Sequence, residues 1–270
     1  MTGESLPIEF GEETAFVDPI EKLVSHANRN RTCVGCESNG SNVLYPSHME
    51  RVTLGRMQNP VRGFLHGFAA IAALVGVIAL VTRSWGHPWA ITGSLIFGLS
   101  LIVMFTISSL YHSIPWGTEW KARLQRIDHS MIYLLVAGTF TPIAIAALDG
   151  VALGIALGLV WTIALTGVTL KAVMPNVATW LSVTLQLAMG WTAVVWFPQI
   201  YTNLGPGALI LIGLGGLCYT VGAVIFLTKR PKLFPRAFSY HEVFHVLVVT
   251  ASVMHFLAVF AYAIPVAVAT

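Results

Sequence analysis

Five polar residues of this chain have the types and spacing of a metal site: Ser108, His112, Asp128, His241 and His245. His241 and His245 are four residues apart, so on a helix they share one face, with Cβ atoms about 5–6 Å apart. Neutral imidazole nitrogens bind zinc at about 2.0–2.1 Å, and this pair can hold one ion. A third nitrogen has to come from another segment, and we expect it from His112. Three histidines leave a fourth position for water, which is typical of catalytic zinc.

The two remaining residues suit the handling of that water. Ser108 lies one turn before His112 and therefore on the same helical face, where its hydroxyl can hydrogen-bond the water or a substrate. Asp128 can accept a proton from the water or hold it in place. For His241 and His245 alone, the alternative is a pair of helix-end histidines bonded to backbone carbonyls or to water.

The composition predicts an integral membrane protein. Of 270 residues, 56% are hydrophobic and only 10% are charged, whereas soluble domains carry about 25% charged residues. The mean hydropathy is +0.74. A net charge of +3, without a basic run interleaved with aromatics, indicates no nucleic-acid partner. Since ionisable groups are costly inside a membrane, the five polar residues call for a function.

Seven stretches are long and apolar enough to cross a hydrocarbon core of about 30 Å. They are apolar all round rather than alternating, which favours helices over a barrel. We therefore predict an all-α, seven-transmembrane-helix bundle in residues 61–270. Six glycines are expected to allow close helix approach. The spans lie near 66–84, 91–112, 128–148, 152–170, 178–197, 207–227 and 241–263, and the glycines are Gly154, Gly158, Gly213, Gly215, Gly216 and Gly222.

The basic residues predict the orientation. Nearly all of them lie on one side of the predicted membrane, and Arg83 alone lies between spans on the other side. By the positive-inside rule the N-terminus is cytoplasmic and the C-terminus is outside. The basic side carries Arg51, Arg56, Arg62, Lys121, Arg123, Arg126, Lys171, Lys229, Arg230, Lys232 and Arg236.

This orientation brings the candidate ligands to one depth. His112 ends an inward-running span, and Asp128, His241 and His245 begin outward-running ones, so all four lie near the cytoplasmic face. The topology depends on Lys and Arg and the cluster on His and Asp, so their agreement is an independent check.

Three segments carry a resemblance to a known family. They are 108–112 (SSLYH), 128–142 (DHSMIYLLVAGTFTP) and 241–245 (HEVFH). In this order they resemble the hemolysin III proteins, the bacterial branch of the progestin and adipoQ receptor family, which includes the adiponectin receptors. The resemblance covers roughly residues 60–264.

The resemblance implies a seven-helix fold with a zinc ion near the cytoplasmic face, in a bacterial plasma (inner) membrane. Carried over one by one, His112, His241 and His245 match the ligands, Asp128 the acid that reaches zinc through water, and Ser108 the motif serine. The family is similar to membrane hydrolases that include alkaline ceramidases. The implied function is a zinc-dependent hydrolase of ceramide-like lipid amides, or another part in membrane-lipid homeostasis, with a ceramide-like or fatty-acid ligand. The alternative is a non-enzymatic sensor, homeostasis factor or cytolysin with a structural zinc.

Four further polar residues have less specific expectations. We expect His66 to be an interfacial histidine or an additional polar contact, and His129 to form interhelical hydrogen bonds, because it points about 100° away from Asp128. His255 is expected to be a satisfied histidine within the bundle. Glu242 is expected to act at the interface or beside the ligands, without binding the metal.

Residues 1–60 differ from the rest of the chain. They hold eight of the 12 acidic residues and lack apolar periodicity, so we expect a mobile cytoplasmic tail. Cys33 and Cys36 form a C-x-x-C pair that could bind metal or cycle redox, but without a second pair we expect incidental reduced thiols. The sequence does not predict the oligomeric state.

Overall fold

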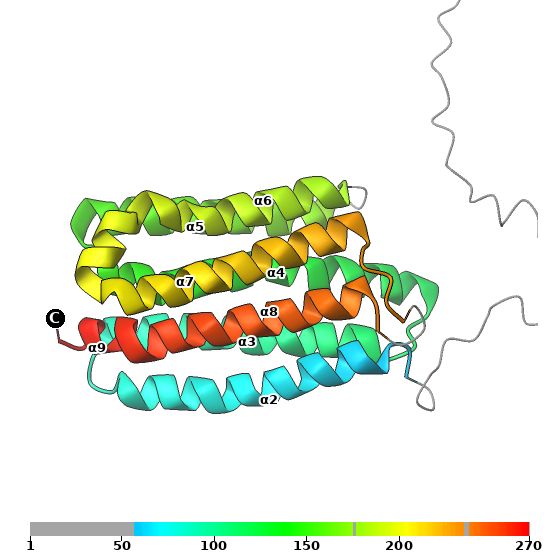
Figure 1. Ribbon diagram of the computed structural model, residues 1–270, viewed down its shortest axis with the longest axis horizontal. Helices are drawn as coiled ribbons and strands as arrows, with labels where there is room; N and C mark the ends of the chain where they lie inside the picture. The colour runs from blue at the N-terminus through cyan, green and yellow to red at the C-terminus, as the bar shows by residue number, and fades with distance from the viewer. Residues whose placement is uncertain (1–56, 175–176, 235–237, 270) are drawn as a thin grey trace, which may run out of the picture. The chain divides into compact units, whose positions relative to one another are not determined.

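The computed structural model describes residues 57–174, 177–234 and 238–269. Within these ranges the chain is helical, and its only extended pairing is an isolated bridge between Phe234 and Phe238. The expected all-α class is therefore confirmed, while the predicted tail and the Cys33–Cys36 pair lie outside the described residues. Figure 1 shows the elements α2 (Pro60–Arg83), α3 (Pro88–Ser113), α4 (Thr118–Ala147), α5 (Gly150–Val173), α6 (Thr179–Trp191), the 3₁₀ turn η1 (Thr192–Trp196), α7 (Phe197–Thr228), α8 (Tyr240–Ala258), the π-helical η2 (Val259–Ala263) and α9 (Ile264–Ala267).

The outer surface of the bundle is apolar, as a membrane protein requires. On α2, Phe68, Ile71, Val75 and Ile78 are all more than half exposed, and their spacing places them on one helical face. An apolar stripe of this length in water would be an aggregation or interaction surface. Facing lipid, it needs no partner.

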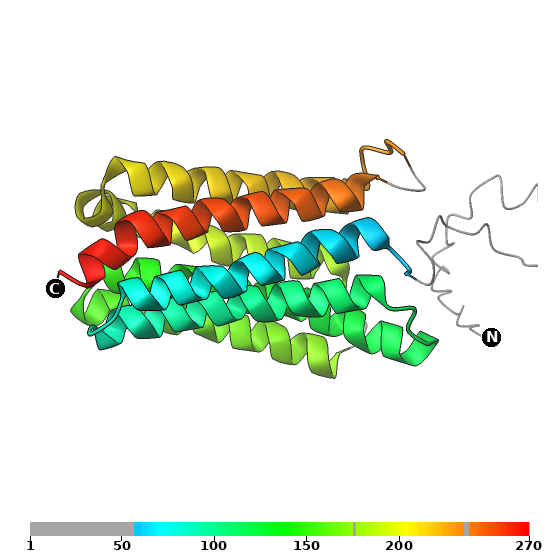
Figure 2. The same cartoon turned by 90° about the horizontal axis from the view of Figure 1, so that it is seen from below.

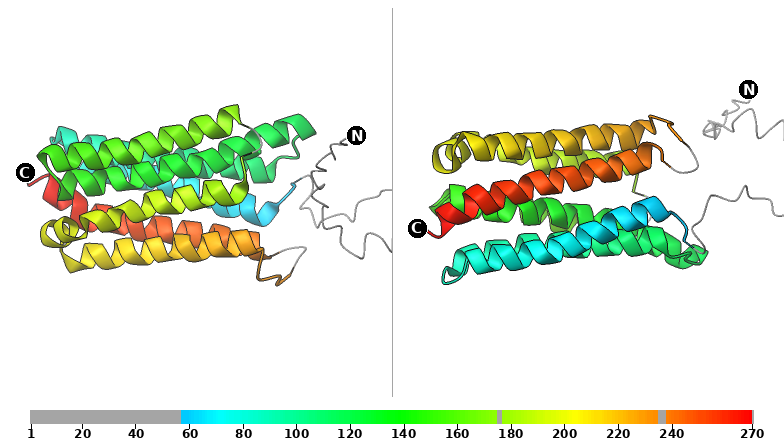
Figure 3. Two further views of the ribbon diagram at one scale, coloured as in Figure 1. Left: turned by 90° about the horizontal axis from the view of Figure 1, so that it is seen from above. Right: turned by 60° about the horizontal axis from the view of Figure 1, so that its bottom comes forward.

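Six helical stretches are long and apolar enough to cross a membrane. One of them, Thr179–Thr228, has 50 residues, which as a straight helix would be about 75 Å long, more than twice the hydrocarbon core. Inside it Gly205 has the non-helical angles φ 81° and ψ 172°. Figures 1 and 3 show the chain turning back in this region. The expected spans 178–197 and 207–227 lie on either side of Gly205.

Helix α4 lies in the interior of the bundle. In its most apolar window 72% of the residues are buried, against 22% in α2, and α4 contacts α3, α5, α6 and α7. Figures 2 and 3 show this arrangement from other sides. Residues on α4 can therefore face the same interior space as residues of the other helices.

Two helices begin earlier than the sequence predicted. Helix α4 begins at Thr118 rather than near 128, and α2 begins at Pro60 rather than near 66. The added turns carry charges such as Glu119 and Arg62, which a hydropathy window excludes although they are helical. Asp128 and His66 consequently lie well inside their helices.

The glycine expectation was right at two of the six positions. A Cβ at Gly215 would lie 2.6 Å from His255, and one at Gly222 would lie 3.3 Å from Phe244, both on α8. The expectation was wrong at the other four, where a Cβ would meet no described side chain or neighbouring helix within 4 Å: Gly154, Gly158, Gly213 and Gly216.

Candidate metal centre

Helices α3 and α8 bring together His112, His241 and His245, as the sequence predicted. One ring nitrogen of each lies within 4.8 Å of those of the other two. His112 is in the last turn of α3, and the other two are in the first two turns of α8. The backbone N–H of Asn59, just before α2, donates to the carbonyl of His112 over 2.9 Å. This bond ties the end of α3 to the start of α2.

The three rings surround a common point. The ring centroids of His112 and His245 are 4.8 Å apart, those of His112 and His241 are 5.3 Å apart, and those of His241 and His245 are 4.9 Å apart. The ring of His112 is nearly perpendicular to both others, at 84° and 74°. The rings therefore do not stack face to face across α3 and α8, and their nitrogens can converge.

Two buried nitrogens of this group are available to bind an ion. His112 Nε2 and His245 Nδ1 are buried and have no hydrogen-bond partner, and each residue is only 2% exposed. Leaving a polar group buried and unpaired costs about 1–3 kcal/mol, so native proteins rarely do so without an ion, a water or a catalytic role. Imidazole nitrogens suit zinc, copper, iron and nickel. The three residues thus fit a metal of this class.

Ser108 and Asp128 lie beside the three histidines and do not join them. Asp128 on α4 is 9% exposed and Ser108 on α3 is 2% exposed, and the Ser108 hydroxyl is a hydrogen-bond partner of the Asp128 carboxyl. The carboxylate oxygens are not within 4.8 Å of all three ring nitrogens. This position suits an acid that acts through water, a role that stays a prediction.

His66 is a fourth histidine at the site, so the expectation of an interfacial residue was wrong, and its position fits the other expectation, an additional contact. It is 3% exposed, its ring centroid lies 4.1 Å from that of His245, and neither of its ring nitrogens has a hydrogen-bond partner. The signal available in the sequence was Asn59–Pro60, because proline at the first helical position marks a helix start. A helix from Pro60 places His66 in the second turn, at the depth of His112.

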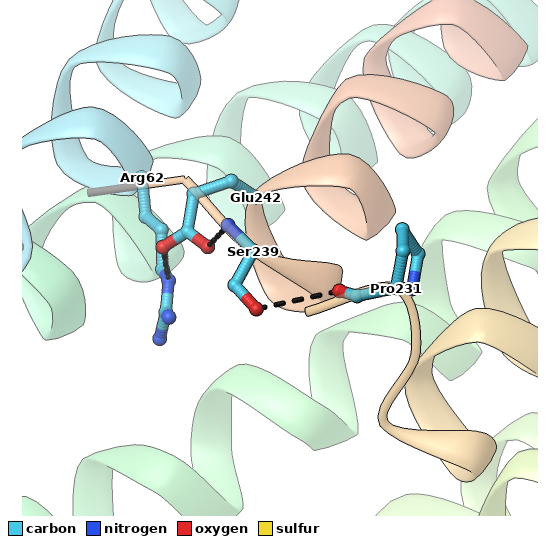
Figure 4. A network of polar contacts seen from close by, with 4 residues as sticks. All are labelled: Arg62, Pro231, Ser239 and Glu242. Carbon is cyan, nitrogen blue, oxygen red and sulfur yellow. Dashed lines mark hydrogen bonds and ion pairs between the residues drawn. The ribbon is translucent and has the colours of Figure 1, made fainter. Parts of the chain in front are cut away.

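An ion pair joins the starts of α2 and α8 next to His241. Arg62 Nε donates to Glu242 Oε1 over 2.6 Å, and the Ser239 N–H donates to Glu242 Oε2 over 2.8 Å (Figure 4). Ser239 and Glu242 form a capping box, which satisfies free N–H groups at the start of α8. The Ser239 hydroxyl also donates to the Pro231 carbonyl over 3.4 Å. Glu242 therefore ties the histidine-bearing turn of α8 to α2 and is outside the group of three histidines, and its expected role without a bond to the metal stays a prediction.

The histidines border a cavity of about 600 Å³ inside the bundle. His66, Ser108, Asp128, His241 and His245 line one part of it, and mostly apolar residues of α4, α6, α7 and α8 line the rest. Pockets of about 300–1,000 Å³ bind one small molecule in most proteins. The polar cluster and the apolar walls thus belong to one cavity.

His129 and His255 make contacts that differ from the expectation. His129 does join two helices, but through its backbone carbonyl, which accepts from Gln186 Nε2 over 3.1 Å. His255 stacks on Tyr219 with ring centroids 5.6 Å apart. Its Nδ1 is buried without a partner, so the expectation of a satisfied histidine was wrong for that atom.

Comparison with known proteins gives a consistent set of relatives. Residues 55–256 match the family described as haemolysin-III related. The chain is 30% identical over 203 residues to the hemolysin-3 homolog of Bacillus subtilis (strain 168), covering 74% of this chain and 92% of that protein. It is 30% identical over 221 residues to hemolysin-3 of Bacillus cereus, covering 81% and 98%. It is also 24% identical over 206 residues to the human monocyte to macrophage differentiation factor, covering 74% and 82%.

Proposed function

Because the chain belongs to the haemolysin-III related family, we propose that it is a seven-span membrane protein that binds zinc and hydrolyses a lipid amide. The observation that carries the proposal is the convergence of three histidines, of which His112 and His245 each have a buried unpaired nitrogen and His241 and His245 line an apolar cavity. His112, His241 and His245 would hold the zinc.

The seven-span topology is supported by the turn at Gly205. Counting the arms on either side of this turn separately adds one crossing to the six apolar stretches. The start of α2 and the end of the chain lie at opposite ends of the bundle (Figures 1 and 2), as an odd number of crossings requires. The distribution of Lys and Arg then favours a cytoplasmic face for the metal site in a bacterial plasma membrane.

The residues around the site have separable tasks. Zinc in such a site lowers the pKa of a bound water toward about 7 and polarises a carbonyl. Asp128 is placed to accept the proton that the water loses and to return it to the leaving amine. The Ser108 hydroxyl donates its one proton to the Asp128 carboxylate and orients it, and it is free to donate to the developing oxyanion once Asp128 has been protonated. The apolar cavity holds the acyl chain and excludes bulk water.

The first test is the metal content of the purified full-length protein by plasma mass spectrometry. We expect about one zinc per chain in the wild type and little in the double variant His241→Ala with His245→Ala, because two of three nitrogens are removed. His87→Ala is the matched control, since His87 is exposed at the start of α3. A well-folded wild type without metal would end the proposal.

The second test separates hydrolysis from a structural metal. In Asp128→Asn the zinc should remain, because Asp128 is not one of the three grouped residues, while hydrolysis of ceramide-like amides should fall by about 10²–10⁴-fold. Unchanged turnover in this variant would exclude the assigned role of Asp128.

A metal that only joins helices is the second candidate function. It is favoured by the origin of the ligands, since α3 and α8 are far apart in sequence. In that case His241→Ala should lower thermal stability and biological activity in parallel, and no lipid product should form. The chain would then act as a sensor, homeostasis factor or cytolysin.

A further inference from the structure

Lys171 points into the bundle, whereas the apolar residues next to it point out. It lies in the last turn of α5 and is 8% exposed, while Leu170, Val173 and Met174 are 38%, 73% and 54% exposed. Lysines near the ends of membrane helices usually extend their ammonium outward to the interface. The inward direction of Lys171 is the reverse of that pattern and was not expected from the sequence.

The ammonium group has no described carboxylate partner. The ion pair found among residues 57–174, 177–234 and 238–269 is Arg62–Glu242. Two polar lining residues near Lys171 already have hydrogen bonds: the Ser182 carbonyl accepts from Tyr133 over 3.1 Å, and Gln186 donates to the His129 carbonyl over 3.1 Å. Asp128 is the described carboxylate that lines the same cavity, but no ion pair joins it to Lys171. Lys171 therefore brings to the cavity a positive charge that is not part of a described ion pair. A charge in this position normally has a partner.

The remainder of the cavity is suited to a hydrocarbon chain. Leu187, Val194, Phe197 and Leu209 are among the apolar residues that α6, η1 and α7 contribute. About 600 Å³ is the volume of a pocket for one small ligand. A cation at the α5 and α6 border of such a space complements one acyl chain with a negatively charged head.

We propose that Lys171 forms an anion-binding subsite, and that the cavity takes a single-chain lipid whose head group is a carboxylate or a phosphate. The subsite lies on α5, apart from the metal ligands of α3 and α8. It rests on the lipid cavity of the proposed function but not on the metal or on hydrolysis.

Equilibrium dialysis of the full-length protein in zwitterionic phosphatidylcholine nanodiscs tests this. The probes share one chain and differ in head group: oleate, 1-oleoyl lysophosphatidate and neutral oleyl alcohol. We expect at least one anionic probe to bind about tenfold more tightly than the alcohol, which corresponds to one charge-assisted hydrogen bond. A larger gain in affinity over the alcohol for oleate identifies the head group as that of a fatty acid. A larger gain for lysophosphatidate identifies it as that of a phospholipid.

Variants assign the effect to one side chain. Lys171→Met should remove the preference for the anion and leave the alcohol affinity unchanged, and Lys171→Arg should keep the preference. Lys229→Met, at an exposed position after α7, is the matched control. Equal wild-type affinity for all three probes, or full anion preference in Lys171→Met, would overturn the inference. The preference should persist in His241→Ala with His245→Ala, so failure of the metal chemistry and failure of this subsite are distinguishable.

Discussion

The imidazole ring of His66 lies 4.1 Å, centroid to centroid, from the ring of His245, with the two planes tilted by 37°. This contact makes α2 a third helix at the candidate metal centre. His66 also meets Phe105 of α3 edge on, with ring centroids 5.0 Å apart. Its ring is thus held between the two helices that carry the three candidate ligands, and both of its nitrogens are buried without hydrogen bonds.

Replacing His66 should weaken metal binding without abolishing it. In His66→Phe we expect about one metal per chain at saturation but an affinity lower by about 10–100-fold, as for other residues that orient metal ligands. His66 is outside the group of three nitrogens but in contact with His245. Competition with a chelator of known affinity measures the change.

His87→Phe is the matched control for this measurement, because His87 is exposed. Wild-type affinity in His66→Phe would mean that the ring only fills space. Complete loss of metal from a folded protein would make His66 a direct ligand.

The Arg62–Glu242 contact should stabilise the bundle through two separable effects. Glu242→Gln removes the charge that faces Arg62 but retains a residue able to complete the capping box, whereas Glu242→Ala removes both. The side chains are 17% and 7% exposed, between a surface and a fully buried pair, so we expect a loss of about 2 kcal/mol for Ala and less for Gln. Midpoints of thermal unfolding in detergent give the order of stability of the wild type and the two variants.

Glu119→Gln, at an exposed position in the first turn of α4, controls for the general loss of an acidic group. Equal midpoints for Glu242→Ala and wild type would show that the ion pair and the cap contribute nothing measurable.

Two glycines of α7 offer a test of helix packing. In Gly215→Ala the new methyl group would lie 2.6 Å from the His255 ring, which is held against Tyr219, so the free energy of unfolding should fall by about 1–3 kcal/mol. Gly213→Ala meets no described side chain or neighbouring helix within 4 Å and should be neutral, or stabilising by up to about 1 kcal/mol through helix propensity. Midpoints of thermal unfolding in one detergent compare them. A reversed order would contradict the close approach of α7 and α8 at Gly215.

The grouping of the three histidines was predictable because it depends only on residue spacing along a helix and on the depth of each residue in the membrane. The spacing of His241 and His245 places them on one face of any helix, and the basic loops bring His112 to the same depth. His66 was missed because a hydropathy window detects the apolar part of a helix and not its start at Pro60. The side of α5 that faces inward, and hence the role of Lys171, depends on packing against α4 and α6. Local sequence does not encode that packing.

The turn at Gly205 also shows which features hydropathy predicts and which it does not. Hydropathy predicts two spans, 178–197 and 207–227, because the residues between them are less apolar, and the structure has one apolar helical stretch, Thr179–Thr228, with a non-helical Gly205 inside it. Hydropathy did not predict that the helix continues through η1 and Phe197 almost to Gly205. Only a residue without a Cβ adopts φ 81° without strain, so the glycine permits the reversal.

Membrane orientation is the remaining prediction, and protein fusions at the C-terminus and in the loop after α7 test it. Seven crossings with the basic loops inside place the end of α9 outside and the loop after α7, with Lys229, Arg230 and Lys232, in the cytoplasm. Alkaline phosphatase fused after Thr270 should therefore be active in intact bacteria. A green fluorescent protein fused at the same position, and exported by the same route, should be dark. The reciprocal fusions after residue 232 should behave in the opposite way. An inactive phosphatase with a fluorescent protein at the C-terminus would require an even number of crossings or an inverted bundle. In an inverted bundle the metal site would face the outside, where the proposed chemistry would act on lipids of the other leaflet.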